Sequence, residues 1–277
     1  MEFYKGTKVM RKLILPKFLC PKFKTELVRL GGKNDGGYVV PQLSLEKTDT
    51  LYSFGLGDDW SFEKQFKKKS GAKVICFDHS VTLIYWLKRF IKDLIELFLL
   101  RSDSKEKFKR FFSFFYYKFF FNNSETIHVK SFFGTIGQIM PDMKNVEIID
   151  MNLILKKWES KNCFMKVDIE GNEYRVLGQI IEHQAKLSGL VIEFHNCDLM
   201  LEKIKLFIEK FDLDLVHIHV NNFGIVTKDG FPTVIELMFS PRKFNSKREE
   251  NRSNFPAQSL DQPNNKNEED IRISFYQ

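Results

Sequence analysis

The sequence has few cysteines and no long apolar run, and each shortage excludes a class of protein. Its four cysteines, Cys20, Cys76, Cys163 and Cys197, lie far apart without a CxxC pair, so neither a zinc ribbon nor a dense disulfide framework is expected. No uninterrupted apolar stretch reaches the roughly 18 residues of a membrane-spanning helix, and the basic residues 1–24 lack a signal-peptide core. We therefore expect a cytoplasmic protein.

The composition is otherwise that of an ordinary globular protein, with an uneven distribution of charge. The chain has 277 residues, of which 43% are hydrophobic and 29% charged, so it can bury a sizeable core. The formal net charge is +7. Residues 1–25 hold seven Lys/Arg against one Glu, and residues 81–124 hold nine against four Asp/Glu. The basic character is therefore regional, and an acidic partner is expected at those two segments.

Apolar strand-like runs alternate with helix-length segments from Thr50 onward, which predicts a parallel α/β sheet with helices on both faces. We expect a Rossmann-like, seven-stranded, mostly parallel sheet whose last two strands form an antiparallel hairpin. The expected strands are Leu51–Gly57, Lys73–Asp78, Thr126–Phe133, Cys163–Asp168, Gly189–His195, Leu213–Val220 and Thr233–Phe239.

The spacing of these runs also sets the expected domain organisation. Residues 1–28 form a basic N-terminal segment, and residues 29–240 form the α/β domain. The connection between the second and third strands is too long for one crossover helix, so we expect a helical, aromatic-rich insertion at 81–124. Residues 241–277 are polar with few large apolar side chains, which predicts a flexible tail.

A glycine turn follows the first strand and carries an unusual number of carboxylates. Gly55 and Gly57 would let the backbone approach a ligand, and Asp78 follows Gly57 by about 21 residues, the offset at which an acid meets ribose hydroxyls. The third glycine of GxGxxG is missing, and Asp58 and Glu63 stand where open amides would face a pyrophosphate. These carboxylates favour the cationic sulfonium of S-adenosylmethionine over a dinucleotide. Alternatively, the glycines only make a tight turn.

A second glycine-rich loop precedes the first strand of the sheet. It contains Asp35, Gly36 and Tyr38, and it could fold over the cofactor as a flap. The alternative is a surface turn whose glycines adopt positive φ.

Acids and imidazoles follow the fourth, fifth and sixth strands, at one edge of the predicted sheet. Asp168 and Glu170 end the fourth strand, Glu193 and His195 the fifth, and His219 lies near the end of the sixth. We expect His195 or His219 to accept a proton, Glu170 to share in catalysis, and Asp168 to serve the cofactor or a metal. Asp168, Glu193 and His195 could equally hold a divalent ion such as Mg²⁺, and the sequence leaves this choice open.

Six segments, in order, resemble those of FkbM-type S-adenosylmethionine-dependent methyltransferases and their methyltransferase-like relatives. They are RxGGxNDGGYVV, YSFGxGxDWSFE, CFDxS, KVDIEGNE, IEFH and HxHxNN, and the likeness spans about residues 29–239. The resemblance implies a class I fold and makes 29–240 a methyltransferase domain, with the cofactor across Gly55–Asp58 and Asp78. It also implies methyl transfer to a hydroxyl oxygen of a sugar, glycoconjugate or related small molecule, as in polysaccharide modification.

The insertion at 81–124 contains ten Phe and carries an excess of positive charge. It could lie at the inner face of a membrane or contact a lipid-linked acceptor, or it could bury its rings against the core or another subunit of a homo-oligomer. Nucleic acid is a disfavoured partner because no known binding module is present.

The leading interpretation is therefore an O-methyltransferase. Two alternatives stay open: a NAD-dependent oxidoreductase on a similar sheet, and a non-catalytic, membrane-associated binding module.

Overall fold

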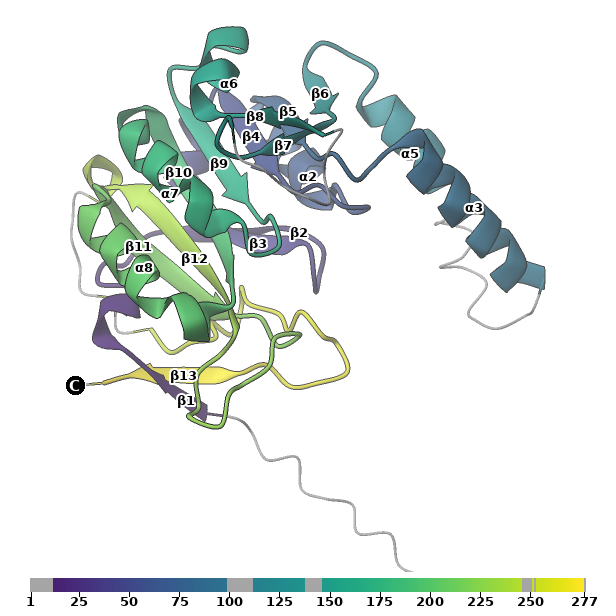
Figure 1. Cartoon of the computed structure of the whole chain (residues 1–277). Helices are drawn as coiled ribbons and strands as arrows, with labels where there is room; N and C mark the ends of the chain where they lie inside the picture. Colours follow the sequence, from purple (N-terminus) through teal and green to yellow (C-terminus); the bar gives the residue numbers. More distant parts are fainter. Residues whose placement is uncertain (1–11, 99–111, 138–145, 246–250, 252, 277) are drawn as a thin grey trace, which may run out of the picture.

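The computed structural model describes residues 12–98, 112–137, 146–245, 251 and 253–276 (Figure 1). Its central sheet consists of β4 (Thr50–Phe54), β5 (Lys73–Phe77), β6 (Thr126–Val129), β9 (Cys163–Val167), β10 (Leu187–His195), β11 (Leu213–Val220) and β12 (Val234–Pro241). The strand order is β11-β12-β10-β9-β4-β5-β6, and only β12 is antiparallel to its neighbours. The predicted seven-stranded, mostly parallel sheet with a C-terminal hairpin is confirmed. The third expected strand is shorter than predicted.

Helices cover both faces of the sheet because its strands are apolar on both sides. One face packs against α6 (Met151–Lys157), α7 (Glu173–Glu182) and α8 (Cys197–Lys210) (Figure 1). The other packs against α1 (Gln42–Glu46), α2 (Ser61–Ser70) and the antiparallel hairpin of β2 (Leu27–Gly31) and β3 (Gly37–Pro41). Local signals set the helix ends: Asp150 accepts a hydrogen bond from Leu153 N at the start of α6, and α2 ends at Gly71 with φ +73°.

The remaining elements are short. A parallel pair of β7 (Ser131–Phe133) and β8 (Glu147–Ile149) lies outside the main sheet, and single 3₁₀ turns occur at η1 (Lys17–Leu19), η3 (Gln184–Lys186) and η4 (Arg242–Phe244).

A row of buried polar side chains crosses the sheet on the face that packs against α1 and α2. Ser53 of β4 is the register partner of Lys166 of β9, and Glu236 of β12 is the partner of both Glu193 of β10 and His219 of β11. Alternation explains the placement, because the neighbours of Glu193, Ile192 and Phe194, point to the opposite core. All five polar residues are buried, so each needs a partner inside the protein.

The polar C-terminal segment is packed onto the fold, which corrects the expectation of a flexible tail. Its strand β13 (Arg272–Phe275) pairs in parallel with β1 (Lys12–Leu15), from the basic N-terminal segment. Phe255, Ile271 and Ile273 are buried in the core. A few well-placed apolar residues, together with hydrogen bonds from the tail to the sheet, therefore order a segment whose average composition suggests disorder.

The described residues of the insertion form helices α3 (Leu83–Phe98) and α5 (Ser113–Phe120), in agreement with the predicted helical insertion; residues 99–111 lie outside the described part. We call this helix pair the arm. Figure 1 shows it extending away from the sheet beyond β5 and β6. Within the described residues, no helix combines the length and apolarity needed to cross a bilayer.

Candidate functional site

A cavity of ≈ 430 Å³ opens where β9, β10 and β11 end, and we call it the acidic cavity. Its lining residues are Asp35, Asp168, Glu170, Glu193, His195, Asn221, Phe223, Gly224 and Val234. Open α/β sheets bind their ligands at the carboxyl ends of the strands, so the cavity lies where the sequence predicts a site.

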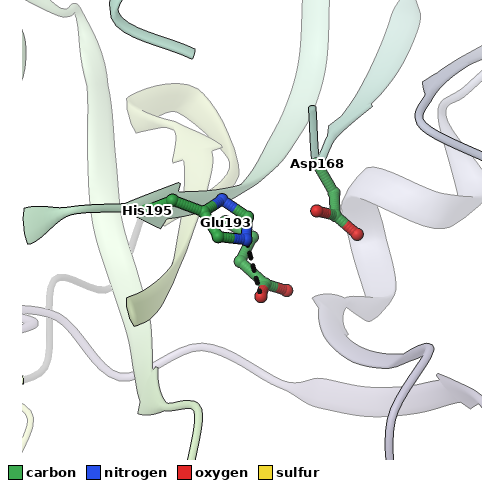
Figure 2. Close-up of side chains that lie close together, drawn as sticks. All are labelled: Asp168, Glu193 and His195. Atoms are coloured by element: carbon green, nitrogen blue, oxygen red, sulfur yellow. Dashed lines mark ion pairs between the residues drawn. The ribbon is translucent and has the colours of Figure 1, made fainter. Parts of the chain in front are cut away.

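Three of the predicted residues form a tight group in this cavity, the acid–imidazole cluster of Asp168, Glu193 and His195. One potential ligand atom from each lies within 4.8 Å of the other two. Figure 2 shows the Glu193 carboxylate beside the His195 ring, with Asp168 directed toward the same space from the adjoining strand. His195 Nε2 lies 3.7 Å from Glu193 Oε1 and 3.5 Å from Glu170 Oε2 at the exposed mouth.

The electrostatics of the cluster are dominated by carboxylates. Burial raises the pKa of Glu193 well above its usual value, and the nearby charges of Asp168 and Glu236 raise it further. Burial alone would lower the pKa of His195, but Glu173, Glu193 and Asp168 outweigh it and raise that pKa to about 9. His195 is therefore protonated at neutral pH, and it can act as a base only when another cation offsets these acids.

Glu173 is a site residue that sequence reasoning missed, and it fixes the orientation of His195. Its buried Oε1 accepts hydrogen bonds from Ile169 N at 3.0 Å and Gly171 N at 3.1 Å, and it lies 3.2 Å from His195 Nδ1. The signal was present, because Glu173 is the last acid of the KVDIEGNE segment. Anchoring Nδ1 leaves Nε2 facing the cavity.

Tyr38 and Lys166 hold the carboxylates from the side of β3 and β9. Tyr38 Oη lies 2.9 Å from Asp168 Oδ2 and 3.2 Å from Glu193 Oε2, within hydrogen-bond distance of both. Lys166 Nζ donates to Gly55 O and lies 3.6 Å from Asp168 Oδ2. Burial alone would lower the pKa of Lys166, but Asp168, Glu63 and Glu193 raise it, so this buried lysine stays charged. A lysine inside an apolar strand was the available signal for this residue.

Asn221 also binds the cluster, and it was not among the predicted residues. Its Nδ2 donates to Glu193 Oε1 at 2.9 Å from the end of β11. Glu193 therefore has a neutral hydrogen-bond partner on each carboxylate oxygen, with Tyr38 on the other.

The glycine turn is held by Asp78, which the sequence assigned to a ribose. Asp78 Oδ2 accepts from Leu56 N at 2.9 Å and Gly57 N at 2.8 Å, and Oδ1 accepts from Ser80 N at 2.7 Å and Ser80 Oγ at 2.6 Å. Burial alone would raise the pKa of Asp78, but these bonds lower it. These hydrogen bonds occupy the roughly four acceptor sites of a carboxylate, so Asp78 organises the turn itself.

The two turn glycines meet different surroundings. A Cβ on Gly55, where φ is +80°, would lie 1.7 Å from Asp168 O, so this glycine permits close approach to the neighbouring strand. A Cβ on Gly57, where φ is +57°, would meet nothing within 4 Å, so open space lies beside this part of the turn.

Other predicted residues lie away from the acidic cavity. Glu63 is buried beneath the turn, where it accepts a hydrogen bond from Ser53 Oγ at 2.6 Å, and Asp58 forms an ion pair with Arg89 of the arm. His219 is 3% exposed; its Nδ1 lies 3.3 Å from Glu236 Oε2 and its Nε2 lies 3.0 Å from Asp270 Oδ1. The structure therefore gives His219 no access to an acceptor in this cavity, and the tail instead uses it as an anchor.

The predicted flap is the turn between β2 and β3, and it is held in place. Arg29 Nη2 donates to Asn34 O at 2.8 Å, and Asn34 Nδ2 donates to Pro263 O in the tail at 2.8 Å. Asp35 lines the cavity, and burial raises its pKa. Gly36 has φ +75° and lies against Asp59, since a Cβ there would be 3.0 Å from Asp59 Oδ2.

A second cavity, of ≈ 200 Å³, lies at the base of the arm and was not predicted. Its lining residues are Val81, Thr82, Leu83, Trp86, Tyr117, Lys118, Phe121, His128 and Lys130. The His128 ring bonds the backbone oxygen of Asp78 at 2.9 Å, so this aromatic cavity adjoins the residue that holds the glycine turn.

Comparisons of the chain with known proteins found no match in sequence and only weak similarity to solved structures. No family model and no curated protein sequence matches it. Similar solved structures include precorrin-6y C5,15-methyltransferase from Geobacter metallireducens, with 11% identity over 72% of this chain and 83% of that chain, at a TM-score of 0.34. An rRNA methylase from Streptococcus thermophilus is 10% identical over 72% and 92% of the two chains, at a TM-score of 0.35. Likeness at this level does not extend to cofactor or substrate.

Proposed function

We propose that the protein is an S-adenosylmethionine-dependent methyltransferase that methylates a hydroxyl oxygen of a sugar, a glycoconjugate or a related small molecule. The observation that carries the proposal is the acid–imidazole cluster at the carboxyl ends of β9 and β10, next to a glycine turn at the end of β4. The resemblance of the KVDIEGNE and YSFGxGxDWSFE segments to FkbM-type enzymes supports the choice of reaction.

The surroundings of the turn fit the cofactor. A sulfonium and an amino group are cationic, and Asp35 and Asp168 supply carboxylates on the cavity side. On the other side, Trp86, Tyr117 and Phe121 line an aromatic cavity that suits a planar heterocycle, and the space beside Gly57 is open. The bound cofactor supplies an electrophilic methyl group. This chain has to align an acceptor oxygen with it and take up the proton.

Asp168, Glu193 and His195 also fit a divalent ion such as Mg²⁺. Two carboxylates and an imidazole converge within 4.8 Å, and the raised pKa of Glu193 indicates that the site favours added positive charge. A bound ion would lower the pKa of a coordinated hydroxyl. An ion held by His195 Nε2 would take the place of the proton there, so His195 would then be a ligand and not the base.

The residues of the cavity then take distinct roles in the proposal. When no ion occupies Nε2, His195, oriented by Glu173, is the proton acceptor, and Glu170 at the mouth takes the proton onward to solvent. Tyr38 and Asn221 position the Glu193 carboxylate by hydrogen bonds. Lys166 and Asp78 are positioning residues that act through the strand ends and the glycine turn.

Calorimetric titration with S-adenosylmethionine and with NAD tests the cofactor. We expect S-adenosylmethionine to bind. Asp168→Asn should weaken its binding by about tenfold, which corresponds to the free energy of one hydrogen bond to a charged group. The exposed Asp212→Asn is the matched control and should bind as the wild type does. Binding of NAD alone would indicate an oxidoreductase, and binding of neither would indicate a non-catalytic module.

Titration with Mg²⁺ tests the metal separately. Binding that is lost in Glu193→Gln and kept in the exposed Glu209→Gln supports the ion site. If the wild type binds no Mg²⁺ yet transfers methyl groups, the ion is removed from the proposal and the methyltransferase stays.

A further inference from the structure

The arm exposes apolar side chains that a protein usually buries. On α3, Leu83, Ile84, Leu87, Ile91 and Ile95 are 58%, 66%, 59%, 48% and 53% exposed. Their spacing of three or four residues places them on one face of the helix, so they form a continuous apolar stripe. Contiguous exposed apolar surface marks a contact with something outside the fold.

The second helix of the arm continues this character. Phe115, Tyr116 and Phe119 of α5 are 60%, 60% and 85% exposed. By contrast, Trp86 and Tyr117 are buried at the base of the arm, where both rings pack edge-on to Trp60. The aromatic residues are therefore divided between an inner set that attaches the arm and an outer set that faces solvent.

Cationic side chains lie beside the exposed apolar surface. Lys88 and Lys92 are exposed and lie about one helical turn from Ile84 and Ile95, respectively, along the edge of the stripe. Lys118 is exposed on α5 between Tyr116 and Phe119. Apolar groups at the centre and lysines at the margin are the arrangement of helices that lie in a membrane interface.

We propose that the arm docks on a membrane surface that contains anionic lipid, with its apolar stripe among the acyl chains and Lys88, Lys92 and Lys118 at the phosphate headgroups. Charge complementarity selects this occupant, because anionic headgroups match the lysine margin. Neither α3 nor α5 is a membrane-spanning helix. The ion pair of Arg89 with Asp58 ties the docked arm to the glycine turn. The proposal does not depend on the proposed methyl transfer.

Vesicle sedimentation of the full chain tests the proposal with phosphatidylcholine alone and with phosphatidylcholine mixed with phosphatidylglycerol. We expect binding to the mixed vesicles that weakens at high salt. Leu87→Asn should lower the partition coefficient by about tenfold, which corresponds to the free energy of burying one leucine side chain. Lys88→Gln should lower it by about fivefold. Matched controls are Leu199→Asn and Lys203→Gln, which alter exposed residues of α8.

Each outcome decides the proposal. Selective loss of binding in the Leu87 and Lys88 variants supports it, provided that circular dichroism shows the same helix content as the wild type. Absence of binding to both kinds of vesicle overturns it, as does equal binding by arm and control variants. A dimer that dissociates in Leu87→Asn without any vesicle binding would show that a second copy of the chain covers the stripe.

Discussion

The acidic cavity and the arm depart from the usual distribution of residues in opposite ways. At the cavity, Glu193 in the lining and Lys166 beside Asp168 are charged or ionisable groups that lie buried. On the arm, Ile84 and Leu87 are apolar groups that lie in water. Each arrangement costs free energy in the isolated protein. The difference between the two regions agrees with the two proposals, a cationic ligand in the cavity and an anionic membrane surface at the arm.

The largest expected effect concerns Lys166, the buried lysine beside Asp168. Lys166→Met should lower the free energy of unfolding by about 3 kcal/mol, because it leaves Asp168 and Glu63 without their buried cation. Urea denaturation measures the change, with the exposed Lys203→Met as control. An unchanged midpoint would show that the carboxylates are neutral.

Substitutions of the two glycines in the turn between these regions should lower the free energy of unfolding by different amounts. Gly55→Ala should cost about 3 kcal/mol, since its Cβ would overlap Asp168 O and its φ is positive. Gly57→Ala should cost about 1 kcal/mol, because only its φ of +57° is unfavourable. Equal losses in thermal unfolding would contradict the close approach at Gly55.

Substitutions of the two histidines predicted to be catalytic should lower turnover by different factors. His195→Gln should lower turnover by about 100-fold, the usual contribution of a general base. His219→Gln should change turnover by less than about threefold, because its ring is bonded to Glu236 and Asp270 and does not line the acidic cavity. A methyl-transfer assay measures both. Comparable losses in the two variants would restore His219 as a catalytic candidate.

The raised pKa of His195 predicts a dependence of stability on pH. Because the folded pKa of about 9 exceeds the unfolded value of about 6.5, His195 stabilises the fold fully below pH ~6.5. That contribution is lost as pH rises through about 9 and amounts to about 2 kcal/mol after solvent screening. His195→Gln should flatten this part of the curve of unfolding free energy against pH. A curve identical to that of the wild type would contradict the shift.

The smallest expected effect lies on the arm. Leu87→Asn should change the free energy of unfolding by no more than about 0.5 kcal/mol, as expected of an exposed side chain. A loss of several kcal/mol in thermal unfolding would show that the stripe is packed in solution.

The sequence predicted the sheet and most of the cavity for identifiable reasons. Short, nearly continuous apolar runs that end in turns located every strand of the main sheet. Parallel strands bring their carboxyl ends together, so the order of the residues alone was enough to group Asp168, Glu193 and His195. The same reasoning placed His219 in the site, but the structure covers it with Asp270 of the C-terminal segment. Alternation along a strand predicts the face on which a side chain lies, and it does not predict which segment covers that face.

The parts that sequence reasoning missed depend on contacts between distant segments. The packing of Ile273 beside Leu13 follows from strand pairing across the whole chain, which composition does not reveal. The two hydrogen bonds that Asp78 accepts from Leu56 N and Gly57 N of the glycine turn depend on the detailed path of the loop. Lys166 gave a local signal, a cation within an apolar strand, but its partners Glu63 and Glu193 lie on other elements of the fold.

The most direct test of the central claim is a crystal structure with S-adenosylhomocysteine bound. We expect the nucleoside against Gly57 and the aromatic cavity, with its sulfur directed at Asp168, Glu193 and His195. Density for the ligand elsewhere, or a sulfur directed away from these three residues, would contradict it.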